Sequence, residues 1–329
     1  MTATQEKSLD LGDGLTLAYE EIGYPSSSEV VIFFHGVLSV GMASEIPPAF
    51  EARHIHFIAP TLPGWGNSSP VPRGVEYHDY LYRCIDALLR HLHPDKDDLR
   101  LYISGGSFGT VVSQIIYGAP YDKFPYGRQI VAMLLIAPFS PPHHHKEFNK
   151  SLSLSNWIAV GTPAKVIPFK LFFRLGIVGL KTKVNTPEAA KKFINDYVFE
   201  HMKPNEMQAF VKWKHAKGLK DGEELDTLAD GVYRSTRKTW AGLLGVSDVI
   251  HSNWGGYNPA QLDEEHTKPV FFCLTKEDKD TLRMGEWLAG QLRGSLVRYE
   301  EGGHVGSLFV MDDIWEDFLA RYCGPATVQ

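Results

Sequence analysis

A lone serine stands among glycines in the stretch from Gly105 to Gly109, which reads GGSFG. The stretch fits the pattern G-x-S-x-G, follows the apolar run LRLYI and precedes the helical run TVVSQIIYG. Between a strand and a helix, this pattern forms a sharp turn that exposes the serine hydroxyl, and the glycines on either side avoid steric clashes. A hydroxyl presented in this way can attack a carbonyl carbon, so Ser107 is a candidate nucleophile.

A serine nucleophile needs a base to take its proton and a carboxylate to orient that base. Where the serine stands in such a turn between a strand and a helix, the three groups follow one another along the chain as serine, acid and histidine. Asp278 follows the apolar run KPVFFCLT, with Glu277 and Asp280 beside it, and His304 is the one histidine of 14 beyond them. We predict His304 as the base and Asp278 as the acid, with Asp280 and Glu277 as alternatives.

Attack on a carbonyl also requires hydrogen-bond donors for the negative charge that develops on its oxygen. The run FFHGVLSV places Val37 just past a predicted strand, and Phe108 directly follows the nucleophile. We expect the backbone amides of Val37 and Phe108 to form this oxyanion hole. His35, Gly36 and Trp65 are expected to border the substrate site, with His35 bonding loop backbone rather than reacting.

Apolar runs alternate with helical runs such as YHDYLYRCIDALLRHL, residues 77–92, and together they predict the elements that must hold the candidate residues. EVVIFFHG, HIHFIAPTLPG, LRLYISGG and IVAMLLIAP are nearly continuous apolar runs, typical of strands buried on both faces of a parallel sheet. The chain opens with KSLDL and LTLAYEEIG, an antiparallel hairpin in which Asp13 and Gly14 supply the turn. We therefore predict an α/β fold with a mostly parallel sheet covered by helices on both faces.

The alternation stops between Pro138 and Pro269, a gap far longer than a crossover connection needs. We predict a core made of residues 1–138 and 265–329, and a helical cap made of residues 139–264. The apolar stretch 157–184 either packs on the core, which we favour, or covers a lipophilic pocket or touches a membrane. Thr186 is expected to cap a following amphipathic helix, and its aromatic residues to pack in the core or line the cleft.

Composition excludes several classes of protein. The chain has 329 residues, a net charge of -6 and scattered basic residues, so we expect no nucleic-acid partner. Three widely spaced cysteines predict neither disulfides nor a zinc site, and the consecutive histidines 143–145 are interpreted as loop polarity. Without a signal-like start or a long apolar run, we expect a cytoplasmic protein that needs no cofactor or metal, and we leave its oligomeric state open.

Four motifs together resemble the α/β-hydrolase family, in particular its capped, serine-dependent branch of esterases and proline iminopeptidases. They are His35-Gly36, the PGWGNS run of residues 63–68, the GGSFG run, and Gly303-His304. The resemblance covers residues 7–138 and 265–325. It implies an eight-stranded, mostly parallel sheet with an inserted cap, and it assigns to Ser107, Asp278 and His304 the roles given above.

Departures from the family pattern affect the acid and the choice of branch. LTKED lacks the glycine that usually precedes the acid by two or three residues, which leaves Asp278, Asp280 and Glu277 all open. HGVLS lacks the His-Gly-Gly-Pro-Gly motif of proline iminopeptidases, although GGSFG resembles their turn. A serine at position 107 excludes the epoxide hydrolase and haloalkane dehalogenase members, which use an aspartate.

We expect a serine hydrolase that cleaves a small to medium apolar ester or a related acyl compound through an acyl-enzyme. Three alternatives stay open: an aminopeptidase, a carbon–carbon bond hydrolase with the same triad, and a binding module without catalysis. An aminopeptidase would need acidic residues in the cap to hold a free amine, for which Glu223, Glu224 and Asp226 are candidates.

Overall fold

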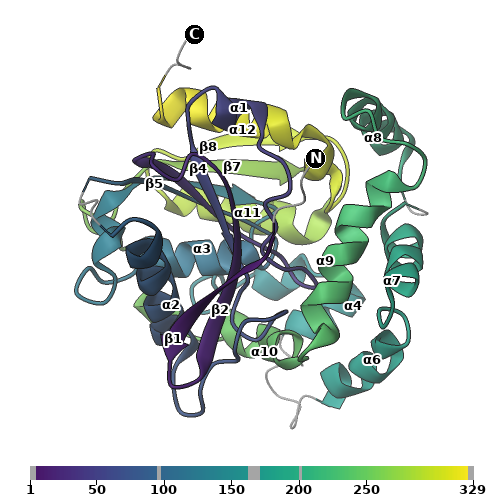
Figure 1. Ribbon diagram of the computed structural model, residues 1–329, viewed down its shortest axis with the longest axis horizontal. Coiled ribbons are helices and arrows are strands. Elements are labelled where there is room, and N and C mark those ends of the chain that lie inside the picture. Colours follow the sequence, from purple (N-terminus) through teal and green to yellow (C-terminus); the bar gives the residue numbers. More distant parts are fainter. Residues whose placement is uncertain (1–4, 95–97, 162–170, 200–201, 325–329) are drawn as a thin grey trace.

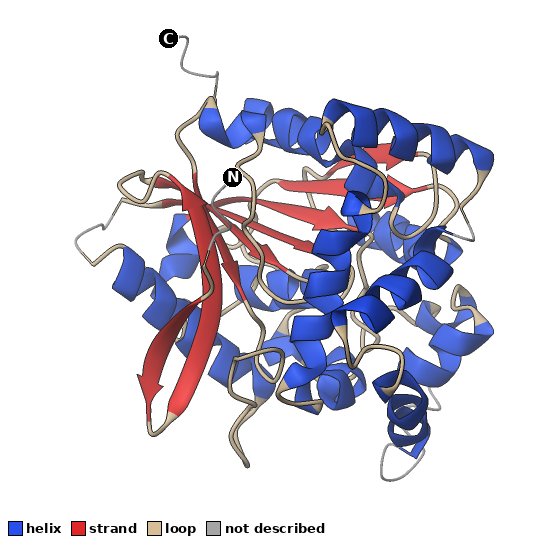
Figure 2. Ribbon diagram, turned by 45° about the vertical axis from the view of Figure 1, so that its right-hand side comes forward, coloured by secondary structure: helices blue, strands red, loops and turns tan. Residues whose placement is uncertain are grey.

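A single eight-stranded sheet forms the centre of the computed structural model, which describes residues 5–94, 98–161, 171–199 and 202–324 (Figures 1 and 2). The strand order is β1-β2-β4-β3-β5-β6-β7-β8. Strand β2 pairs antiparallel with β1 and β4, and the other pairs are parallel. The strands are β1 (Lys7–Gly12), β2 (Leu15–Gly23), β3 (Glu29–Phe34), β4 (His56–Pro60), β5 (Arg100–Gly106), β6 (Ile130–Ile136), β7 (Val270–Thr275) and β8 (Leu296–Glu300).

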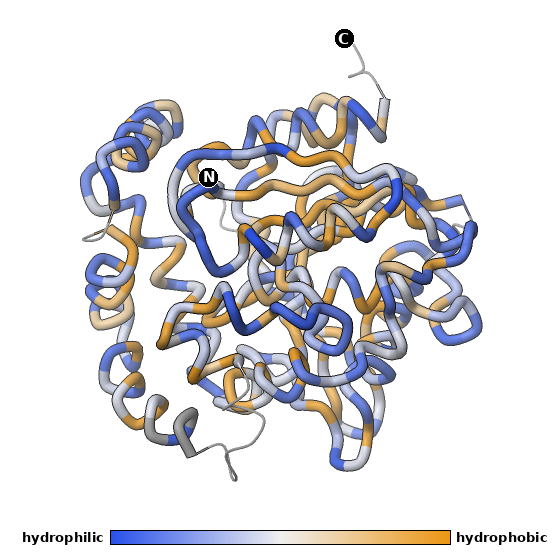
Figure 3. The backbone as a smooth tube through the Cα atoms, turned by 180° about the vertical axis from the view of Figure 1, so that it is seen from behind, coloured by the Kyte–Doolittle hydropathy of each residue, from blue (hydrophilic) through white to orange (hydrophobic). Residues whose placement is uncertain are grey.

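Helices cover both faces of the sheet, as the alternation of apolar runs predicted. On one face lie α1 (Pro48–Glu51) and α12 (Met311–Tyr322), and on the other lie α2 (Tyr77–Leu92), α3 (Gly109–Tyr117) and α11 (Lys279–Gln291) (Figure 1). Side chains of the central strands are buried on both sides: Val31 packs toward α12, and Val30 and Ile32 toward α2 and α3. Hydrophobic residues accordingly gather on the central strands (Figure 3).

The hairpin and the helix of residues 77–92 form where the sequence predicts them. Strands β1 and β2 pair across a turn in which Asp13 and Gly14 have φ angles of 56° and 72°. Both residue types tolerate this left-handed conformation, which two-residue hairpin turns require. Helix α2 spans the run YHDYLYRCIDALLRHL from end to end.

The segment 139–264, which we call the cap segment, contains several helices and, among its described residues, no strand. Its helices are α4 (Leu154–Val160), α6 (Leu171–Lys181), α7 (Pro187–Ile194), α8 (Pro204–Ala216), α9 (Asp226–Arg237) and α10 (Ala241–Ile250). Short helical turns occupy Pro125–Gln129, Phe148–Lys150, Asn195–Phe199, Glu223–Leu225, Trp254–Gly256 and Gly306–Val310. In the described ranges, no helix is long and apolar enough to cross a membrane.

Helices α7 and α9 of the cap segment share an apolar cluster of their own. Ala190 and Ile194 of α7 pack with Ala229 and Val232 of α9. The Thr186 side chain accepts a hydrogen bond from an α7 amide at 3.1 Å, as its predicted capping role requires. Part of the predicted apolar stretch 157–184, residues 162–170, lies outside the described residues.

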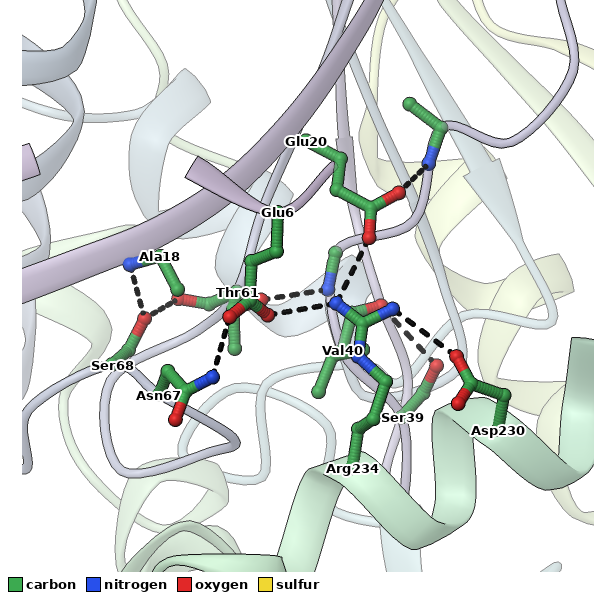
Figure 4. A network of polar contacts seen from close by, with 12 residues as sticks. Glu6, Ala18, Glu20, Ser39, Val40, Thr61, Asn67, Ser68, Asp230 and Arg234 are labelled. Atoms are coloured by element: carbon green, nitrogen blue, oxygen red, sulfur yellow. Dashed lines mark hydrogen bonds and ion pairs between the residues drawn. The ribbon is translucent and has the colours of Figure 1, made fainter. Parts of the chain in front are cut away.

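An arginine on α9 joins the cap segment to the sheet (Figure 4). Nη2 of Arg234 lies 2.9 Å from Glu20 on β2 and 2.8 Å from Glu6, and Nη1 lies 3.2 Å from Asp230. Glu20 is 3% exposed, and its other carboxylate oxygen accepts the amide hydrogen of Ala43 at 2.9 Å. A buried carboxylate without a partner is costly, so the ion pair between Arg234 and Glu20 holds α9 against the sheet.

The carboxyl ends of four parallel strands bring the predicted site residues to one edge of the sheet. Ser107 directly follows β5, and the loop of residues 35–37 follows β3, which is the neighbour of β5. Asp278 lies three residues beyond β7, and His304 lies four residues beyond β8. Neighbouring parallel strands end on the same side, so residues 170 or more positions apart in sequence meet there.

The turn between β5 and α3 is so crowded that two of its residues must be glycine. A Cβ atom at Gly109 would lie 1.9 Å from the carbonyl oxygen of Phe34 on β3. At Gly105 it would lie 2.5 Å from the carbonyl oxygen of Gly109 and 2.6 Å from Oγ of Ser113. Backbone cannot yield as a flexible side chain does, so the close approach of β3, β5 and α3 depends on these glycines.

We predict that Gly109→Ala lowers the free energy of unfolding by about 3 kcal/mol or more, because the added methyl group overlaps the β3 backbone. Gly290→Ala is the matched control, since Gly290 lies in α11 with no atom within 4 Å of an added Cβ. The control should gain about 0.5 kcal/mol from its higher helix propensity. Urea unfolding measures both values, and equal stability of the two variants would refute the steric explanation.

Candidate active site

Ser107 adopts a backbone conformation that residues with a side chain rarely take. Its φ angle is 52°, which costs about 1–3 kcal/mol for a residue other than glycine. Neighbouring groups hold it there: its amide donates to the carbonyl of Ile136 at 2.9 Å, and its carbonyl accepts from the Thr110 amide at 2.9 Å and hydroxyl at 2.6 Å. The turn thus carries the serine hydroxyl beyond the end of β5.

The imidazole of His304 lies between Ser107 and Asp278. Its Nε2 is 2.9 Å from Oγ of Ser107, and its Nδ1 is 2.6 Å from Oδ2 of Asp278. An ionised carboxylate can only accept hydrogen bonds, so Nδ1 carries the proton and Nε2 is left to accept the serine proton. This is the arrangement of a nucleophile, a base and an orienting acid.

The position of Asp278 is set by the start of α11. Asp278 is the N-cap residue of this helix and accepts hydrogen bonds from the backbone amides of Asp280 and Thr281 at 3.2 and 3.3 Å. The Thr281 hydroxyl also donates to Oδ2 at 2.5 Å, the same oxygen that faces His304. Thr281 is not among the residues predicted from the sequence, although a threonine three residues after a capping aspartate is a visible signal.

The pKa values of the two charged partners move in opposite directions. Desolvation by itself would raise the pKa of Asp278, but the hydrogen bond and charge of His304 and the hydrogen bonds of Thr281 together outweigh it and lower this pKa. Desolvation by itself would lower the pKa of His304, but the hydrogen bond and charge of Asp278 and the charge of Asp280 together outweigh it and raise this pKa. Each group therefore stabilises the charged form of the other, which favours proton uptake by His304.

The two other carboxylates of the acid turn bind the cap segment instead of the histidine. Asp280 accepts hydrogen bonds from the amide and hydroxyl of Ser153, ahead of α4, at 2.7 and 3.0 Å. Glu277 forms an ion pair with Lys203, ahead of α8, at 3.0 Å. Among the three carboxylates that the sequence left open, the one hydrogen-bonded to the imidazole of His304 is Asp278.

The loop after β3 lies against the serine, and His35 holds it there. A Cβ atom at Gly36 would lie 3.4 Å from Cβ of Ser107, so the backbone leading to Val37 passes beside the nucleophile. His35 is buried, accepts the amide hydrogen of Leu62 at 2.9 Å, and bonds the Gly36 carbonyl at 2.7 Å. Burial lowers the pKa of His35 to about 4, so the ring is neutral and serves the loop.

A cleft with a volume of about 310 Å³ lies between the loop of residues 63–77 and α10. Phe108, the residue after the nucleophile, forms part of its wall together with Trp65. Trp65 is 2% exposed and packs so closely on α10 that a Cβ atom at Gly242 would lie 2.5 Å from its indole ring. Phe108, whose amide was predicted to face the developing charge, therefore lines this cleft, whereas Ser107 and His304 are not among its lining residues.

Two of the consecutive histidines 143–145 contact other protein groups through their side chains. His145 stacks on Trp287 with the ring centres 4.5 Å apart and contacts the Ser140 hydroxyl at 2.7 Å, and His143 bonds the carbonyl of His251. In the part of the chain that the structure describes, no group of three or more His, Cys, Asp or Glu residues is arranged to hold a metal ion.

Comparisons with known proteins concern the fold of the chain. A sequence model of the alpha/beta hydrolase family matches residues 31–321. A hydrolase from Pseudomonas aeruginosa PA01 has 15% identity and a TM-score of 0.60 over 96% of this chain and 97% of that chain. A thermophilic esterase from Thermogutta terrifontis has 14% identity and a TM-score of 0.57, with 95% and 96% coverage. MenH from S. aureus has 15% identity and a TM-score of 0.54 over 92% of this chain and 96% of that chain. No curated protein sequence matches the chain.

We predict that Asp278→Asn slows the reaction of Ser107 with a fluorophosphonate by about three orders of magnitude, because an amide neither fixes the imidazole tautomer nor stabilises its charge. Glu277→Gln and Asp280→Asn are matched controls on the same turn and should slow labelling by less than about tenfold. Labelling rates of the three variants measure this difference. If either control slowed labelling more than Asp278→Asn does, the acid would not be Asp278.

The labelling rate should also depend on pH through His304. Only the neutral imidazole accepts the serine proton, so the rate falls as the pH drops through the pKa of His304. Because Asp278 raises this pKa, the midpoint should lie above the value of about 6.5 that an unperturbed histidine has. In Asp278→Asn it should move to lower pH. A midpoint that the substitution leaves in place would contradict the assigned pair.

Proposed function

This chain belongs to the alpha/beta hydrolase family, and from that premise we propose that it is a serine hydrolase acting on small to medium apolar esters or related acyl compounds. The observation that carries the proposal is the hydrogen-bonded series from Ser107 through His304 to Asp278. Such a series converts a weakly nucleophilic hydroxyl into one that attacks carbonyl carbon.

The first half of the proposed reaction transfers the acyl group to the serine. Oγ of Ser107 attacks the ester carbonyl while its proton passes to Nε2 of His304, and a tetrahedral intermediate with a negatively charged oxygen forms. Asp278 stabilises the imidazolium but keeps its own charge. The intermediate collapses when the bond to the alcohol oxygen breaks and His304 returns the proton to that oxygen, which leaves an acyl-serine and a free alcohol.

We assign the oxyanion hole of this reaction to the amides of Val37 and Phe108. Phe108 stands at the N-terminus of α3, where the first backbone N–H groups have no partner inside the helix. The close approach of Gly36 to Ser107 supports a position for the Val37 amide near the same oxygen. Two fixed donors at this point stabilise the charge without reorganisation during the reaction.

The second half of the proposed reaction releases the acid. A water molecule loses a proton to Nε2 of His304 as it attacks the acyl-serine, and the proton then returns to Oγ of Ser107. The side chain of His304 is 46% exposed, which gives solvent water a path to the base. The products are a carboxylic acid and the regenerated enzyme.

The cleft beside Phe108 supports an apolar acyl or alcohol group of moderate size. Trp65, Val71, Phe108 and Val249 contribute apolar surface, and the volume of about 310 Å³ suits a short chain or a single ring. The proposed ester substrate also agrees with the Thermogutta terrifontis neighbour, which is an esterase by its description.

The acidic residues that an aminopeptidase would use are engaged inside the cap segment. Glu223 accepts a backbone amide at 2.8 Å, Glu224 pairs with Lys214 at 3.3 Å, and Asp226 pairs with Lys191 at 2.6 Å. Lysines thus neutralise the charges of Glu224 and Asp226, and a backbone amide occupies one oxygen of Glu223, so these candidates are already bound to protein groups. We therefore favour esters over peptides as substrates.

We predict that a fluorophosphonate probe labels the wild-type protein and that Ser107→Ala abolishes labelling, because the substitution removes the hydroxyl that His304 contacts. A series of p-nitrophenyl esters should show the highest kcat/KM at short to medium chain length, where the acyl group fills the cleft. Aminoacyl anilides serve as the comparison and should be turned over far more slowly.

Labelling that persists in Ser107→Ala would place the nucleophile elsewhere. Wild-type protein that neither reacts with the probe nor turns over any ester would overturn the proposed hydrolase function and favour a binding module. Faster turnover of anilides than of esters would favour the aminopeptidase.

A further inference from the structure

A buried glutamate of the cap segment reaches the loop that carries the catalytic base. Glu206 is 7% exposed and lies in the first turn of α8. Its Oε2 accepts the amide hydrogen of Lys203 at 3.1 Å, which caps the helix. Its Oε1 accepts the amide hydrogen of Gly303, the residue next to His304, at 2.6 Å. One carboxylate thus bridges the cap segment and the histidine loop.

The backbone around Gly303 fits this carboxylate closely. Gly302 has a φ angle of 99°, and a Cβ atom there would lie 2.7 Å from Cγ of Glu206. The carbonyl of Gly302 accepts the amide hydrogen of Glu277 at 3.1 Å, and Glu277 is the neighbour of Asp278. The loop of the base is therefore held on one side by Glu206 and on the other by the acid turn.

We propose that Glu206 is a positioning residue that fixes the His304 loop and so sets the contact between His304 and Asp278. The proposal concerns the reaction inferred above and deepens it. Glycines at 302, 303 and 306 give this loop backbone freedom that a single strong hydrogen bond can restrict. A hydrogen bond to a charged oxygen is about twice as strong as one between neutral groups, which suits Glu206 to this task.

The hydrogen bond between Glu206 and Gly303 matters for proton transfer because it restricts the position of His304. His304 must meet two partners at once, at 2.6 Å and 2.9 Å, and a loop shift of about 1 Å lengthens at least one of these bonds. Removing the carboxylate would also leave the partly buried amide of Gly303 without its acceptor. We therefore expect the loss of Glu206 to weaken the Asp278–His304 pair as well as the cap segment.

Two substitutions separate positioning from stability. Glu206→Asp keeps the charge at the start of α8 but is one methylene too short to span from the helix to Gly303. Glu206→Gln keeps the length and one acceptor oxygen for the Gly303 amide. Thr186→Ala is the matched control, because it removes the side-chain cap of α7, another cap helix, without touching the histidine loop.

The first measurement is the NMR titration of the His304 imidazole in the full-length protein, with the resonance assigned from His304→Gln. We expect Glu206→Asp to lower the pKa of His304, because a displaced imidazole loses part of the stabilisation by Asp278. Glu206→Gln should restore most of the wild-type value. Thr186→Ala should lower the melting temperature and leave the titration unchanged.

The second measurement is kcat and KM for a p-nitrophenyl ester, corrected for the concentration of labelled sites. We expect about a tenfold fall in kcat for Glu206→Asp with little change in KM, and recovery in Glu206→Gln. A wild-type titration together with wild-type kcat in Glu206→Asp would overturn the proposal. The titration does not depend on turnover, so it decides the role of Glu206 even if the protein hydrolyses no ester.

Discussion

The close approach of three backbone segments, β3, β5 and the first turn of α3, is the constraint on which the site depends. It leaves no room for a Cβ atom at Gly105 or Gly109, and it forces Ser107 into a left-handed conformation. Hydrogen bonds between Ser107 and residues of β6 and α3 keep it in this strained conformation. The hydroxyl consequently stands beyond the sheet, at the N-terminus of a helix and beside the loop that follows β3.

Three carboxylates in the turn after β7 have different partners, and two of them connect this edge of the sheet to the cap segment. Asp278 is hydrogen-bonded to the imidazole of His304, whereas Glu277 and Asp280 bind the segments ahead of α8 and α4. Each cap contact lies within two residues of the acid. A single turn therefore connects the cap segment to the residues of the proposed proton relay, and Glu206 adds a second connection at the histidine loop.

Much of this arrangement follows from sequence patterns, because strand period, turn chemistry and chain order are local signals. They predict the hairpin at Asp13, the helix of residues 77–92, Ser107 and His304. Chain order alone cannot choose among adjacent carboxylates, since their directions depend on how α11 begins. Glu206 escaped prediction because its partner is a backbone amide 97 positions away, a contact that leaves no trace in residue type or spacing.

The central claim is that Ser107, His304 and Asp278 act as one unit with the amides of Val37 and Phe108. A crystal structure of the protein after reaction with a fluorophosphonate tests it most directly. The account predicts phosphorus bonded to Oγ of Ser107, with one phosphoryl oxygen within about 3.2 Å of both amides and Nδ1 of His304 still bonded to Asp278. An adduct on another residue, or a phosphoryl oxygen turned away from both amides, would contradict it.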